Sequence, residues 1–133
     1  MILHPLFAYS TILLAFVVFV LYVFSLNLFK NTQAFRYTLV LHGFLMVVAL
    51  LSVLAGFSVS NVPLVQSKAP AIWMFPHKWN GILLLLYALF SFLFFWFKGE
   101  NAGKMGLLIS ILGVLLVLFE FFTGWMIRLV FFS

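Results

Sequence analysis

The stretch PHKWNGILLLLYALFSFLFFWF, residues 76–97, joins a short polar segment containing a histidine to a long uncharged run. A membrane-spanning α-helix needs about 20 consecutive, mainly apolar residues. Residues 79–97 meet this requirement, so the stretch predicts a helix that crosses a lipid bilayer and carries His77 and Asn80 close to one membrane surface.

The composition of the whole chain supports a membrane protein. Of its 133 residues, 67% are hydrophobic and 7% are charged, whereas a soluble domain carries about 25% charged residues. So few charges cannot cover a protein surface in water, and lipid is therefore expected to be the solvent for much of the chain. The absence of cysteine excludes disulfides, thiolate catalysis and iron–sulfur clusters. The Lys and Arg residues form no run, so no nucleic-acid partner is expected.

Four apolar runs predict a single four-span membrane domain covering residues 1–133. Two of the three connections between the runs are short, which predicts antiparallel neighbours in an all-α, up-down-up-down four-helix transmembrane bundle. The expected helices cover about residues 6–29, 37–57, 79–97 and 105–127.

The remaining connection, residues 58–76, is expected to be a loop, because its three prolines break helices. Slightly more Lys and Arg residues flank the two short turns than flank the other end of the bundle. Because cytoplasmic loops carry the excess of Lys and Arg, both termini and the long loop are expected on the outer side. The expected location is a bacterial inner membrane.

His4 and His77 are predicted to lie at the same depth. Each stands just before an apolar run, next to Pro5 or Pro76, and the first and third helices of such a bundle run parallel. Two imidazoles at one depth fit bis-histidine ligation of haem iron in a haem b site. The alternative is that both are ordinary interfacial histidines.

A ligand histidine needs its second ring nitrogen held by a hydrogen bond. Asn80 lies three residues after His77 and shares its helix face, so it is a candidate for that supporting role. Trp79 is expected either to pack against the edge of a porphyrin or to act as an interfacial anchor.

His42 enters the membrane from the other side, on the order of 20 Å from the other two histidines. A second haem would need His42 together with Met105, or a five-coordinate iron. The alternative is a structural histidine, hydrogen-bonded to Thr38, Ser110 or a backbone carbonyl.

Glu120 lies within the fourth apolar run, where an ionisable residue is costly and often functional. It is a candidate proton acceptor beside a quinol. The structural alternative is a carboxyl group hydrogen-bonded to Tyr9 or Tyr87.

These motifs resemble the core of the cytochrome b-561 family of transmembrane haem b electron carriers. The resemblance rests on His4-Pro5, Leu41-His42 and the segment His77 to Gly81. It implies an outer haem held by His4 and His77 and an inner haem held partly by His42. The chain lacks the histidine that the fourth core helix of that family supplies. It is also similar to a family of small four-span bacterial membrane proteins of unknown function, through Asn80 and Thr123-Gly124.

The sequence therefore favours a membrane haem b protein that relays electrons between a quinol, or a periplasmic carrier, and a larger redox complex. It would act as an electron-transfer subunit rather than as a free-standing enzyme. Its expected cofactors are haem b and a quinone, and its expected partners are lipid, other membrane subunits or a periplasmic redox protein. The alternative is a non-catalytic structural subunit of a respiratory or photosynthetic membrane complex.

Overall fold

A computed structural model describes residues 3–60 and 71–131, and within these ranges the chain is helical and contains no strand. The prediction of an all-helical chain is confirmed. The elements in chain order are α1 (Leu3–Val23), the π-helix η1 (Phe24–Leu28), α2 (Thr32–Ser60), α4 (Ala71–Lys98), the 3-10 helix η2 (Gly99–Ala102) and α5 (Gly103–Phe131).

Three helical segments are long and apolar enough to cross a membrane: His4–Leu28, Thr32–Ser58 and Met74–Leu129. The third segment includes α4, η2 and α5. Large apolar side chains such as Leu13 and Phe44 are exposed on the outer faces of all the long helices. Exposed apolar surface of this extent suits lipid rather than water, as expected for an integral membrane protein.

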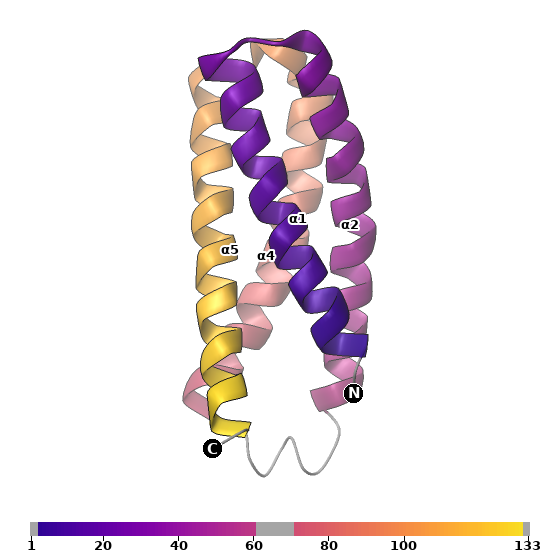
Figure 1. Ribbon diagram of the computed structural model, residues 1–133, viewed down its shortest axis with the longest axis vertical. Helices are drawn as coiled ribbons and strands as arrows, with labels where there is room; N and C mark the ends of the chain where they lie inside the picture. Colours follow the sequence, from indigo (N-terminus) through magenta and orange to yellow (C-terminus); the bar gives the residue numbers. More distant parts are fainter. Residues whose placement is uncertain (1–2, 61–70, 132–133) are drawn as a thin grey trace.

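The four long helices lie side by side along the longest axis of the molecule (Figure 1). Helix α1 packs against α2 and α5, and α4 packs against the same two helices. Aromatic rings fill the space that they enclose, with Phe19, Tyr22 and Phe95 fully buried. The rings of Tyr22 and Phe95 stack with centroids 3.8 Å apart, which joins α1 to α4.

Two tight turns lie at the same end of the molecule, the upper end in Figure 1. In the first, the Asn31 backbone N–H donates to Ser25 O at 2.9 Å, and Asn31 Oδ1 accepts from the Ala34 N–H at 3.0 Å. The Asn31 side chain therefore satisfies one of the free N–H groups at the start of α2. In the second, Gly99 and Gly103 have φ angles of 57° and 58°, a conformation that glycine adopts without a steric penalty.

The helices begin earlier than the sequence predicted. Helices α1 and α4 begin at Leu3 and Ala71, so His4 and His77 lie inside helices rather than before them. Residues 58–60 and 71–76, predicted as loop, are helical, and residues 61–70 lie outside the described residues. Proline does not prevent this, because Pro5 and Pro76 lie within the first two turns of their helices, where at most one helical hydrogen bond is lost.

Candidate functional site

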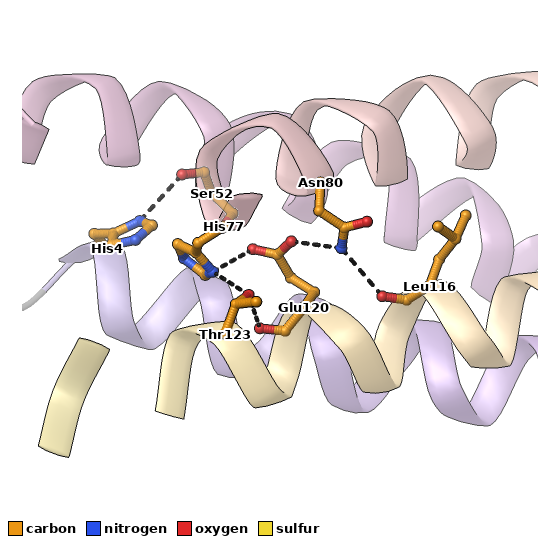
Figure 2. Close-up of polar contacts among 7 residues, drawn as sticks. All are labelled: His4, Ser52, His77, Asn80, Leu116, Glu120 and Thr123. Atoms are coloured by element: carbon orange, nitrogen blue, oxygen red, sulfur yellow. Dashed lines mark hydrogen bonds and ion pairs between the residues drawn. The ribbon is translucent and has the colours of Figure 1, made fainter. Parts of the chain in front are cut away.

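A partly buried histidine–carboxylate pair joins α4 to α5 near the end of the molecule opposite the tight turns (Figure 2). His77 Nδ1 lies 2.7 Å from Glu120 Oε1 and 3.1 Å from Thr123 Oγ1. Asn80 Nδ2 donates to Glu120 Oε2 at 2.8 Å and to Leu116 O at 3.2 Å. Both carboxylate oxygens of Glu120, a residue that is 7% exposed, are therefore held by the protein.

The spacing of these residues follows from helix geometry. On α4 and on α5 the two polar residues are three positions apart, so they lie on one face of each helix. Glycines make room for the side chains of the partner helix. A Cβ atom at Gly124 would lie 3.0 Å from His77 Cε1, and one at Gly81 would lie 3.4 Å from Glu120 Oε1.

The partners of His77 fix the position of its ring hydrogen. The hydroxyl of Thr123 donates to the backbone oxygen of Glu120 at 3.1 Å, so it can only accept from the histidine. An ionised Glu120 is also an acceptor. His77 Nδ1 is therefore the donor, and the free lone pair of the neutral ring is on Nε2.

His4 on α1 has the same arrangement. Its Nδ1 lies 3.3 Å from Ser52 O on α2. A backbone carbonyl only accepts hydrogen bonds, so Nδ1 must carry the hydrogen and Nε2 the lone pair of the neutral ring. A Cβ atom at Gly56 would lie 3.0 Å from His4 Cε1. Figure 2 shows His4 at the same end of the molecule as His77 and Glu120.

His42 has a different environment, because both of its ring nitrogens have partners. Its Nε2 lies 2.9 Å from Ala88 O, which must accept, so Nε2 carries the hydrogen. Its Nδ1 lies 2.7 Å from the Tyr22 hydroxyl, which therefore donates to it. Ser91 Oγ also lies 3.3 Å from Nε2, and the imidazole is completely buried. No lone pair of this ring is left for a metal ion.

The two histidine environments are separate. Ala88, which contacts His42, lies about three helical turns beyond His77 on α4, or roughly 16 Å along the helix axis. His4 and His77 therefore form one candidate site, and His42 belongs to another part of the core.

No family model, curated protein or solved structure matches this chain. Among the described residues, no group of three or more His, Asp or Glu side chains is arranged to hold a metal ion. A haem needs fewer protein ligands, since the porphyrin supplies four of the nitrogen ligands itself. The pair His4 and His77 therefore remains the candidate ligand set.

Several other residues named from the sequence lie in different surroundings from those expected. Asn80 supports Glu120 rather than donating to His77 directly. The expected partners of Glu120 were wrong, because the Tyr9 hydroxyl accepts from Arg128 at 2.8 Å and the Tyr87 hydroxyl donates to Ile109 O.

The two residues named for packing or for a second haem are both largely exposed. Trp79 is 54% exposed and packs against Phe75, with ring centroids 6.1 Å apart. Met105 is 56% exposed. Of the partners weighed for His42, a backbone carbonyl is present, whereas Thr38 donates to Ala34 O and Ser110 donates to Gly106 O.

Sequence reasoning missed Tyr22 as the partner of His42 and gave Thr123 no contact with His77. The signal for Tyr22 was its depth, since it lies near the inner end of the first apolar run and His42 near the inner end of the second. The signal for Thr123 was its position three residues after Glu120, which places both side chains on one helix face.

Proposed function

We propose that this chain is an integral membrane haem b protein in which His4 and His77 are the axial ligands of the haem iron. The observation that carries the proposal is the shared hydrogen-bond pattern of the two rings. Each directs Nδ1–H at an acceptor, Ser52 O for His4 and Glu120 Oε1 for His77. Each therefore keeps Nε2 for a metal ion, which is the usual arrangement of a ligand histidine.

A bound haem b would supply reversible one-electron transfer. The residues of the chain would position it and tune it. Glu120 accepts the Nδ1–H of His77 and so makes that imidazole a stronger electron donor. Asn80 and Thr123 fix the position of the carboxylate and of the ring.

The bundle is proposed to cross the membrane four times, in up-down-up-down order, with both tight turns on the cytoplasmic side. Lys30, Arg36, Lys98 and Lys104 are near the turns, and the excess of basic residues supports this orientation. In a bacterial inner membrane, His4 and His77 would then lie near the periplasmic surface. The resemblance to the cytochrome b-561 core supports the assignment of His4 and His77 as ligands of an outer haem.

In this role the chain would relay electrons between a quinol, or a periplasmic redox protein, and a larger membrane complex. Glu120 remains the candidate proton acceptor for a quinol. The contacts of Glu120 favour a role in supporting His77 over a role as proton acceptor, since His77 and Asn80 already contact its two oxygens. The full engagement of His42 favours one haem over two.

A second candidate function is that of a structural subunit in a respiratory or photosynthetic membrane complex. It is favoured by the large exposed aromatic side chains near the η2 turn, where Trp96 is 62% and Phe97 is 81% exposed. Such side chains are common at protein–protein contacts. Isolation of a stable, haem-free chain only as part of a larger complex would support this function instead.

The test of the haem proposal is the absorption spectrum of protein purified in detergent from haem-replete cells. The expected result is a Soret band and the sharp reduced-minus-oxidised bands of a low-spin haem b. His4→Ala and His77→Ala should each abolish the low-spin bands. His42→Gln is the matched control and should keep them.

Helix content measured by circular dichroism shows whether each variant is folded. If an alanine variant does not fold, the corresponding glutamine variant, His4→Gln or His77→Gln, is used in its place. A folded parent protein without a Soret band would refute the proposal. Unchanged low-spin bands in both the His4 and the His77 variants would also refute it.

A further inference from the structure

We propose that the groove between α2 and α4, near the tight turns, binds an acidic phospholipid, with an acyl chain in the groove and the headgroup phosphate against Arg36. This site is far from His4 and His77 and does not depend on haem. Its argument rests on the shape and lining of the groove and on the unbalanced charge at its end.

The groove has a volume of about 320 Å³ and is almost entirely apolar. Helix α2 contributes residues that share one face, and α4 contributes two aromatic side chains one turn apart. Arg36 is the only charged residue of the lining, which consists of Arg36, Leu39, Val40, Gly43, Phe92 and Trp96.

Gly43 keeps the middle of the groove open. A Cβ atom built at this position would meet no heavy atom within 4 Å. A methyl group here would therefore enter unfilled space without disturbing the helix packing. A glycine in a helix interior costs stability relative to other residues, so its presence beside open space is consistent with room kept for a ligand.

The charge at this end of the molecule favours an anionic ligand. Lys30, Arg36, Lys98 and Lys104 lie in or beside the two turns, where Glu100 is the only carboxylate. The other carboxylate of the chain, Glu120, is paired with His77. Among the residues of 3–60 and 71–131, no ion pair involves Arg36. A phosphate group is a suitable partner, because guanidinium binds its oxygens through two parallel hydrogen bonds.

These two features together identify the class of ligand. An uncharged quinone would fill the apolar groove but would leave Arg36 without a counter-charge. A zwitterionic phospholipid would bring a phosphate together with a cation of its own, which offsets the attraction to Arg36. Free phosphate would pair with Arg36 but would leave the groove unfilled. A phospholipid with a net negative charge satisfies both, and such lipids are enriched in the membrane leaflet that basic residues face.

Trp96 lines the groove and can report on its occupancy. Replacing Trp73, Trp79 and Trp125 with Phe leaves Trp96 as the single tryptophan of the chain. This protein is placed in phosphatidylcholine vesicles containing increasing fractions of a phospholipid brominated on its acyl chains, which quenches tryptophan fluorescence on contact. The brominated lipid is either phosphatidylglycerol, which is acidic, or phosphatidylcholine, which is not.

Brominated phosphatidylglycerol should half-quench Trp96 at a fraction about fivefold lower than brominated phosphatidylcholine, the preference expected when one basic residue attracts a headgroup of net negative charge. Arg36→Gln should bring this ratio close to one. Gly43→Leu should fill the groove and remove the saturable quenching. Lys104→Gln, which removes a cation from the same end but not from the groove, should keep the preference, and added inorganic phosphate should not reduce the quenching.

Equal quenching by the two brominated lipids in the single-tryptophan protein that keeps Arg36 would overturn the proposal. An acidic-lipid preference that survives Arg36→Gln, or that inorganic phosphate abolishes, would also overturn it. Arg36 is exposed and Gly43 faces open space, so neither substitution removes a buried contact. Retained helix content in both variants excludes unfolding as the cause of a lost signal.

Discussion

His77 Nδ1 and Glu120 Oε1 lie 2.7 Å apart across the α4–α5 contact, and this pair connects the candidate ligand histidine to the only carboxylate inside an apolar helix run. A carboxylate in hydrocarbon is costly unless a partner offsets its desolvation. Here His77 and Asn80 supply the partners. The same contact that stabilises the carboxylate also orients the imidazole.

Glu120→Gln should weaken haem binding about 10–100-fold, the usual effect of removing a group that supports a metal ligand. The midpoint potential of bound haem should rise. A neutral amide attracts the Nδ1 proton of His77 less strongly than a carboxylate does, so the imidazole donates less electron density and stabilises ferric iron less. Haem titration and a redox titration measure the two effects. Glu100→Gln, in the η2 turn, is the matched control and should change neither value. An unchanged affinity and potential in Glu120→Gln would show that the carboxylate does not act through His77.

Tyr22→Phe should destabilise the protein by about 1 kcal/mol, within the range for hydrogen bonds in membrane proteins. The substitution leaves the buried Nδ1 of His42 without its donor, and the completely buried site gives water little access. Thermal unfolding in detergent measures the loss. Tyr37→Phe is the control, since Tyr37 is 62% exposed and its hydroxyl accepts from Gln33 on the surface. Equal stability of the two variants would show that the Tyr22–His42 hydrogen bond contributes nothing measurable.

Gly113→Ala should destabilise the protein, whereas Gly43→Ala should not. A Cβ atom at Gly113 would lie 2.6 Å from Cγ of the Phe19 ring, which is completely buried, so the ring or the helices must shift. Overpacking of this kind costs about 1–3 kcal/mol. A Cβ atom at Gly43 meets nothing within 4 Å, so the better helix propensity of alanine should leave stability unchanged or improve it slightly. Thermal unfolding of the two variants in the same detergent compares their stabilities. Similar midpoints would contradict the prediction that a side chain at Gly113 overpacks against Phe19.

The sequence was sufficient to predict the apolar segments and the placement of His4 and His77 at one end. Apolar run length and the position of polar residues along each run are visible in one dimension. The partners of Glu120 and His42 were not predictable in this way. They depend on how each helix is rotated about its own axis, and helices that are apolar on all sides give little sign of which face points inward. The helical start of α4 was missed because proline was given too much weight near a helix beginning, where it is tolerated.

Gly56→Ala and Gly124→Ala should each reduce haem binding without unfolding the protein. At both positions a Cβ atom would lie 3.0 Å from the Cε1 atom of a candidate ligand, His4 for Gly56 and His77 for Gly124, so the imidazole must shift by a few tenths of an ångström. Cε1 lies between the two ring nitrogens, and a shift at this atom moves both the Nδ1 hydrogen bond and the Nε2 lone pair.

Gly81→Ala is the matched control. It is also a helical glycine at the α4–α5 contact, but its Cβ atom would lie 3.4 Å from Glu120 Oε1, an ordinary contact. Haem titration at constant helix content should therefore rank Gly81→Ala close to the parent protein and the other two variants well below it. If all three variants bind haem equally, the two imidazoles are not held closely enough by these glycines to act as a positioned ligand pair.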